Sequence, residues 1–125
     1  MSARRRVSLE RCFSQADFDR FARLSGDANR IHVDPAFAAQ TRFGRTVAHG
    51  MLLTTVLRGL VDRLAPGGRV IEQAVMFPAP SFAAEPLRFS ATLDGRTADG
   101  LEITLEVTRL EDGVATCKGR CRMTA

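Results

Sequence analysis

The stretch GMLLTTVLRGLVDRL, residues 50–64, decides the fold class of this 125-residue chain. Its apolar side chains recur at the three- and four-residue spacings of an α-helix and cover most of the circumference of the first turns. A narrow polar stripe remains at Thr54, Arg58 and Asp62, and Pro66 with the two glycines after it ends the helix. A helix with so little polar surface is expected to be buried on more than one side.

Four segments after this helix have the patterns of strands. Residues 70–78 are mostly apolar. Residues 87–94 and 101–108 alternate apolar with polar side chains, and residues 115–123 alternate small or apolar with polar ones. Asp112-Gly113 is a hairpin signal, which makes the later strands antiparallel. The order predicts an α+β fold in which an antiparallel sheet of about five strands wraps around one long buried helix.

The residues before the long helix predict one strand and an irregular helical region. Residues 7–13 fit the strand. Ser14, with Asp17 three residues later, has the pattern of a capping box for a short helix that ends at Gly26. Asp34 stands before a proline and can cap a further helical turn.

Length and composition indicate the organisation and location of the protein. A chain of 125 residues suffices for one domain, so residues 1–125 are predicted to form a single domain. The hydrophobic share of 45% and the charged share of 26% are ordinary for soluble globular proteins. The longest apolar stretch is interrupted by polar residues and falls short of the ~20 residues of a membrane span. We therefore predict a cytoplasmic protein with no membrane partner.

The net charge of +4 comes almost entirely from arginine and suits an anionic partner. Nucleic acid is not predicted as a partner, because the arginines are spread along the chain without a recognisable binding motif. A phosphate-bearing small molecule and an acidic carrier protein fit equally well.

The three cysteines predict neither disulfides nor a metal site. Cys117 and Cys121 would lie ~13 Å apart on one strand, which exceeds the reach of a disulfide. Neither has histidine or acidic neighbours at the spacing of metal ligands. With Cys12, they are predicted to be small hydrophobic residues in the reduced state.

The polar residues of one short segment carry the chemistry. Both histidines, His32 and His49, lie between the first helix and the long one, as do Asp27 and Asn29. Taken singly, Asp27 could cap a turn and Asn29 could form an Asx turn. Together, a carboxylate and an imidazole from one loop can share one water. Asp27 can take a proton from this water, and His32 can hold the water or pass a proton onward.

Gly50 opens the long helix directly after this segment. The first amides of a helix have no intrahelical partner and lie at the positive end of its dipole. Glycine lets a substrate carbonyl approach this backbone closely. Such an amide facing an acid–base pair suits chemistry at a thioester, where attack on the adjacent double bond leaves an enolate oxygen.

The run LSGDANRIHVDPAFAAQTRFGRTVAHGMLL, residues 24–53, resembles the hydratase motif of the MaoC-like, (R)-specific enoyl-CoA hydratases. The typical pattern is S-G-D-x-N-P-[IL]-H-x-D-x-x-[FY]-A, followed by F-x-x-x-[IV]-x-H-G-M-[LT]. The later strands match in order and length. The resemblance implies a hot-dog fold, usually dimeric, and the reversible addition of water to a trans-2-enoyl thioester to give the (R)-3-hydroxyacyl form.

The resemblance also implies roles for particular residues. Asp27 and His32 match the catalytic pair, and Gly50 matches the residue whose backbone amide binds the thioester carbonyl. Asn29 and His49 are expected to support the loop. Coenzyme A is part of the substrate, so neither a separate cofactor nor a metal is expected, and the expected assembly is a homodimer.

Two positions depart from the family pattern. Arg30 replaces a proline, which loosens the loop and offers a side chain that could reach a phosphate of the coenzyme. The family tends to place Gly-Asp after its F-x-x-P segment, whereas residues 82–86 here read FAAEP, so that turn is expected to be built differently.

Several functions remain open beside hydration of enoyl-CoA. The carrier could be acyl carrier protein, which would make the protein a 3-hydroxyacyl-ACP dehydratase. A hot-dog acyl-CoA thioesterase commonly has a carboxylate on or before the central helix, but residues 50–59 contain no acid. A non-catalytic acyl-thioester-binding module is disfavoured by the joint presence of Asp27, Asn29, His32 and Gly50.

Overall fold

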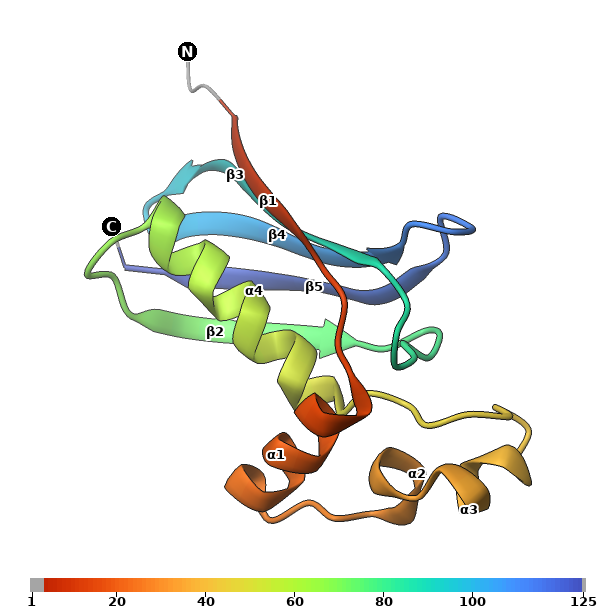
Figure 1. Ribbon diagram of the computed structural model, residues 1–125. Coiled ribbons are helices and arrows are strands. Elements are labelled where there is room, and N and C mark those ends of the chain that lie inside the picture. The colour runs from red at the N-terminus through yellow and green to blue at the C-terminus, as the bar shows by residue number, and fades with distance from the viewer. Residues whose placement is uncertain (1–3, 125) are drawn as a thin grey trace.

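A long helix lies across one face of an antiparallel sheet in the computed structural model, which describes residues 4–124 (Figure 1). The elements in chain order are β1 (Arg5–Arg11), α1 (Gln15–Ser25), α2 (Arg30–Val33), α3 (Pro35–Ala39), α4 (Gly50–Leu64), β2 (Val70–Met76), β3 (Leu87–Thr97), β4 (Gly100–Arg109) and β5 (Ala115–Met123). The five strands follow the order β1-β3-β4-β5-β2, and every neighbouring pair is antiparallel. The predicted hot-dog arrangement is confirmed.

The central helix α4 has the predicted bounds but a different exposed face. Its buried side chains, which pack against the sheet, include Leu53, Leu57, Leu60, Val61 and Leu64. The predicted polar stripe was wrong at Thr54, which is buried and donates its hydroxyl hydrogen to the Gly50 carbonyl at 2.9 Å. Met51 is 61% exposed, and Thr55 is exposed as well. Since successive residues of an α-helix are about 100° apart, Thr55 lies about 20° from Asp62 around the helix axis, whereas Thr54 lies about 80° from it. The helix is therefore buried on one broad side and not all round.

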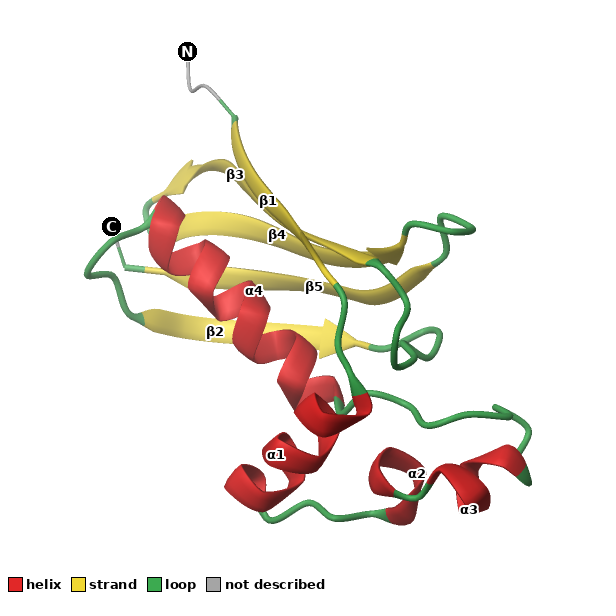
Figure 2. Ribbon diagram, viewed as in Figure 1, coloured by secondary structure: helices red, strands yellow, loops and turns green. Residues whose placement is uncertain are grey.

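The remaining helices gather at one end of the sheet, close to the start of α4 (Figure 2). The capping box of Ser14 and Asp17 is present, and Gly26 ends α1 with a φ of 82°. Asp34 caps α3 by accepting from the Phe37 amide at 3.1 Å. Only α2 was not predicted, because a single turn of helix is too short to show periodicity. No helix among residues 4–124 is long and apolar enough to cross a membrane.

The cysteines are only partly as predicted. Cys117 and Cys121 are buried on β5, and burial raises the pKa of the Cys117 thiol to about 11. Cys12 is exposed, which corrects the prediction that it serves as a hydrophobic residue. It lies after the end of β1, where the chain leaves the sheet, while the next residue, Phe13, is buried instead.

The turn between β2 and β3 holds an alanine in a strained conformation. Ala84 has a φ of 60°, and its amide donates to the Phe13 carbonyl at 2.7 Å. A left-handed residue other than glycine costs roughly 1–2 kcal/mol, whereas glycine adds about 0.5–1 kcal/mol of entropy cost. We therefore expect Ala84→Gly to raise the free energy of unfolding by about 0.5–1 kcal/mol, seen as a Tm increase of a few degrees. Ala83→Gly is the matched control and should lower Tm, because Ala83 packs on the core and has no positive φ.

Candidate active site

Two consecutive turns bring Asp27 and His32 together. After Gly26 ends α1, one Asp27 carboxylate oxygen accepts from the Asn29 amide at 3.2 Å. The Asn29 side chain then caps α2 by accepting from the Ile31 amide at 3.1 Å. The helical turn carries His32 back, so that its Nε2 lies 3.7 Å from the second Asp27 oxygen. The five-residue spacing thus places a carboxylate opposite an imidazole.

The protonation of His32 follows from its second contact. Its Nδ1 lies 2.7 Å from the Val47 carbonyl oxygen, which can only accept, so Nδ1 carries a hydrogen. Nε2 is therefore the nitrogen available for proton transfer toward Asp27. The Val47 amide in turn donates to the Ile31 carbonyl at 3.0 Å, which fixes the segment on both sides. The His32 side chain is 14% exposed and that of Asp27 is 56% exposed.

His49 holds the backbone of Asp27 in place. Its Nε2 donates to the Asp27 carbonyl at 2.9 Å. Its ring stacks on His32, with centroids 3.8 Å apart and planes at 24°, and meets the edge of Phe21 at 4.9 Å. Burial lowers the pKa of His49, so the ring stays neutral and its Nδ1 carries the lone pair. Asp27 and His32 thus both contact a buried, uncharged ring.

A cavity of about 690 Å³ opens beside these residues. Gly50, the first residue of α4, lines it together with Asp27 and His49. A Cβ at Gly50 would lie 2.7 Å from the tip of the Phe77 ring, so the ring packs directly on this glycine and a larger residue would displace it. The other lining residues are Phe21, Ser25, Arg42, Phe43, Val47, Ala48, Met51, Leu53, Phe77, Pro78, Ala79, Pro80, Ser81 and Thr116. The volume suits a small-molecule substrate.

The family model of the MaoC like domain matches residues 2–115. The chain belongs to this family. It is 40% identical over 82 residues to the (R)-specific enoyl-CoA hydratase of Aeromonas caviae, a match covering 64% of this chain and 61% of that protein. A second (R)-specific enoyl-CoA hydratase, from Rhodospirillum rubrum, is 30% identical over 90% of this chain and 80% of its own length.

The fold of this MaoC-like chain matches solved structures over nearly its whole length. The (R)-hydratase from A. caviae superposes with a TM-score of 0.91 at 27% identity, over 99% of this chain and 96% of that chain. Sequence similarity covers less. The chain spans 61% of the first curated relative and 57% of the 3-hydroxybutyryl-CoA dehydratase of Methylorubrum extorquens.

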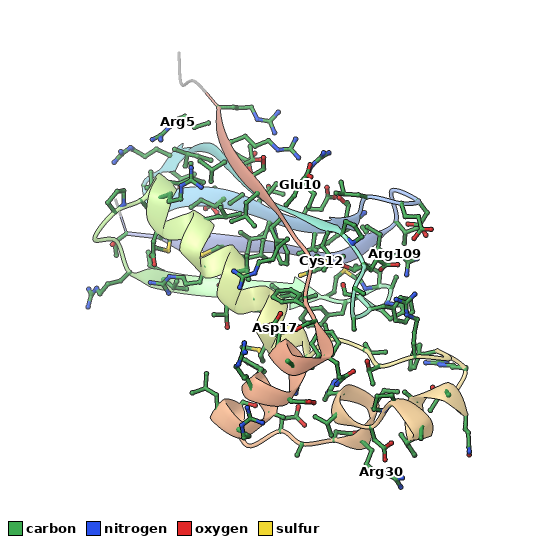
Figure 3. All side chains as sticks on the ribbon, in the orientation of Figure 1. Arg5, Glu10, Cys12, Asp17, Arg30 and Arg109 are labelled. Atoms are coloured by element: carbon green, nitrogen blue, oxygen red, sulfur yellow. The ribbon has the colours of Figure 1, made fainter. Side chains whose placement is uncertain are left out.

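Arg30 lies apart from the cavity of this MaoC-like protein. Its guanidinium binds the Asp34 carboxylate at 3.0 Å and covers the Phe37 ring at 4.5 Å. The side chain points outward from α2 (Figure 3), and a phosphate contact by Arg30 stays a prediction. Arg42, which the sequence did not single out, lines the cavity and is exposed.

Gln15 holds the backbone of His32 in place in this MaoC-like protein, and nothing in the sequence predicts this role. Its side-chain amide donates to the His32 carbonyl at 2.8 Å, and its oxygen accepts from the Thr46 hydroxyl at 2.7 Å. A glutamine at the start of a helix resembles any solvated residue, so only the folded chain reveals this bridge. It connects α1 to His32 and to Thr46, which lie on either side of residues 33–45.

Asp27, His32 and His49 each offer one ligand atom within 4.8 Å of the others, a spacing that a metal could use. Other bonds disfavour this role. The Nε2 hydrogen of His49 is given to the Asp27 carbonyl, and His49 Nδ1 is buried. A metal-free site stays the prediction.

Proposed function

We propose that this protein adds water to trans-2-enoyl-CoA thioesters to form (R)-3-hydroxyacyl-CoA, or catalyses the reverse dehydration. The observation that carries the proposal is the 3.7 Å separation of Asp27 and His32 beside the cavity that Gly50 lines. The names of the relatives, which include enoyl-CoA hydratases and 3-hydroxyacyl dehydratases, support the same chemistry. A hydro-lyase of this kind requires no separate cofactor.

The geometry supports a mechanism with one shared water. The Gly50 amide donates to the thioester oxygen and holds the enoyl carbon chain against the catalytic pair. Asp27 takes a proton from the water while the water oxygen bonds to C3 of the enoyl chain. The electron pair of the double bond then moves to the thioester oxygen. The enolate then collapses as the catalytic pair returns a proton to C2. Hydroxide and proton together account for the added water.

The decisive test is a hydration assay across crotonyl-, hexenoyl-, octenoyl- and branched enoyl-CoA, with the chirality of the product determined. We expect (R)-3-hydroxyacyl-CoA from at least one substrate. Formation of free coenzyme A instead would indicate a thioesterase, although the only acid on α4 is Asp62 in its last turn, which is exposed and pairs with Arg58 at 3.1 Å. The same substrates on acyl carrier protein decide between the two carriers.

Arg42 and Arg30 give a matched pair for testing the coenzyme contact. We expect Arg42→Ala to raise KM for enoyl-CoA several-fold at nearly constant kcat, because a phosphate contact contributes to binding in both ground and transition states. Arg30→Ala should have a smaller effect, since its guanidinium is already bound to Asp34. The dependence of KM on salt should weaken in the variant that loses the contact. A larger rise in KM for Arg30→Ala than for Arg42→Ala would instead assign the phosphate contact to Arg30, as the sequence suggests.

We also propose a two-fold dimer that extends the sheet through its edge strand β2. Ile71 and Met76 on this edge strand are 51% and 59% exposed, more than a free edge would be expected to carry. Sedimentation at micromolar concentration should show a dimer, and Ile71→Lys should shift it to the monomer. Leu24→Lys, at an 83% exposed position on α1, is the control and should stay dimeric. A monomeric wild-type protein would contradict the proposal.

A further inference from the structure

Val47 lies between the loop that carries His32 and the turn that follows β2. On one side, its carbonyl oxygen lies 2.7 Å from His32 Nδ1. On the other side, it pairs with Phe82 in an isolated antiparallel bridge. Next to this bridge, the Ala48 amide donates to the Ser81 carbonyl at 2.8 Å. A single bridge outside a sheet has no ladder of further pairs to support it, so side-chain contacts must hold it in place.

Two arginines from distant parts of the chain cover the Phe82 ring. The Cζ atoms of Arg45 and Arg109 lie 4.7 Å and 5.8 Å from the centroid of the ring. Both distances are within the roughly 6 Å range of cation–π attraction. Each arginine also donates to the backbone of the turn, Arg45 to the Ala83 carbonyl at 2.7 Å and Arg109 to the Pro80 carbonyl at 3.1 Å. The turn is therefore held both at its ring and at its backbone.

The two arginines connect the bridge to different parts of the fold. Arg109 is the last residue of β4 and its side chain is only 14% exposed, so it ties Phe82 to the sheet. Arg45 stands two residues before Val47, so it ties the same ring to the segment that contacts His32. Direct contacts thus connect the end of β4 with the imidazole of His32.

The position of the Val47 carbonyl decides which nitrogen of His32 is free to react. While the carbonyl accepts from Nδ1, the proton stays on Nδ1 and the lone pair stays on Nε2, which lies 3.7 Å from Asp27. If the carbonyl moves away, the proton can settle on Nε2 instead. A neutral ring with its proton on Nε2 cannot accept another proton there. Displacement of the carbonyl therefore lowers the fraction of His32 that can act.

We propose that Phe82, covered by Arg45 and Arg109, is a positioning residue that keeps His32 in the tautomer needed for catalysis. The inference rests on the proposed function for its catalytic consequence, whereas the tautomer can be measured without a substrate. The cavity is lined by Val47 and Ser81 and not by Phe82. Loss of the ring should therefore lower kcat and leave KM nearly unchanged.

Nitrogen-15 NMR of the imidazole rings measures the tautomers directly, because this chain has only two histidines. At a pH where both rings are neutral, the wild-type protein should show His32 protonated on Nδ1 and His49 protonated on Nε2. His32→Asn assigns the signals, since only those of His49 remain.

Phe82→Leu keeps an apolar side chain but removes the aromatic ring. We expect a measurable part of His32 to convert to the Nε2-protonated tautomer. kcat should fall by about three- to tenfold, less than the ~10²-fold cost of a 1 Å misplacement, because the tautomer is shifted and not lost. An unchanged tautomer in Phe82→Leu would overturn the inference, and so would a shifted tautomer with unchanged kcat.

Two further variants separate positioning from folding. Phe82→Tyr keeps the aromatic ring and should retain both the tautomer and kcat. Arg45→Met removes one guanidinium and its bond to the Ala83 carbonyl at an exposed position, so the protein should fold while the tautomer and kcat change in the same direction as in Phe82→Leu. A lower Tm without any change of tautomer would show that the arginines only stabilise the fold, and would contradict the proposal.

Phe37→Leu is the matched control. Its ring, on α3, is covered by the Arg30 guanidinium at 4.5 Å, so this variant removes a cation–π pair of the same kind. Neither the tautomer of His32 nor kcat should change. An equal effect of Phe37→Leu would remove the special role of Phe82.

The inference and the proposed function fail in different ways. A His32 tautomer that responds to Phe82→Leu in a protein without hydratase activity would leave the positioning role standing and remove the proposed function. Hydration with the same kcat and the same tautomer in Phe82→Leu would do the opposite.

Discussion

Asp27→Asn is expected to lower kcat by ~10²–10⁴-fold, the contribution typical of a general acid–base group. Asparagine keeps the shape of aspartate and its carbonyl oxygen can still accept from the Asn29 amide, but it cannot take a proton from water. Because the carboxylate acts in the transition state more than in binding, KM should change little. Steady-state hydration kinetics on the best enoyl-CoA substrate give both constants.

Folding should survive this change. The Asp27 side chain is 56% exposed, and the His49 bond involves only the backbone carbonyl of Asp27. Asp62→Asn is a matched control, since Asp62 lies exposed on α4 in a surface pair with Arg58 that contributes ~0.3–0.5 kcal/mol. Near-full activity of Asp27→Asn on every acyl length tried would refute the assignment of the base.

Loss of the His32 imidazole is expected to reduce kcat by a similar ~10²–10⁴-fold. His32→Ala also removes the bond to the Val47 carbonyl, so part of its effect could come from a displaced loop. His32→Asn separates the two causes, because its side-chain amide can donate to Val47 as Nδ1 does, while nothing replaces Nε2. Equal loss of activity in both variants, with thermal melting of His32→Asn near wild type, would assign the loss to Nε2.

The double variant distinguishes a shared water from two independent roles. If Asp27 and His32 act on the same water, the combination of Asp27→Asn with His32→Asn should be little slower than the slower single variant. Multiplication of the two effects would show that the groups act at separate steps. The 3.7 Å between the carboxylate and Nε2 is the reason to expect coupling.

Much of the fold was predictable because its signals are local. The apolar run of α4, the capping box at Ser14 and the turn at Gly113 depend on residues close together in the chain, and the structure contains all three. The error at Thr54 arose because a stripe at spacing four drifts around a helix, so the face that meets the sheet is decided by packing. The edge strand β1 likewise runs from Arg5 to Arg11 and not over the predicted residues 7–13, since tertiary contacts set strand boundaries.

The active site divides in the same way. The motif singles out Asp27, His32 and Gly50, and the structure places Asp27 3.7 Å from His32 and in the cavity that Gly50 lines. Their assigned roles stay predictions for the experiments above. The support from Gln15 and the buried hydroxyl of Thr116 could not be predicted. The first needs a bond across 17 residues, and the second needs a β-bulge, which regular alternation does not encode.

The bonds that hold Val47 between Ile31 and His32 also determine how this protein can change over generations. They tie the two ends of residues 33–46 together, so this excursion is closed at its neck independently of its interior. Lengthening a closed loop is cheap, about 0.6 kcal/mol per doubling. Arg42 and Phe43, which line the cavity, belong to the excursion, whereas Asp27, His32 and Gly50 do not. Natural drift, or a grafted segment in the laboratory, can therefore replace the entrance while the chemistry is inherited intact.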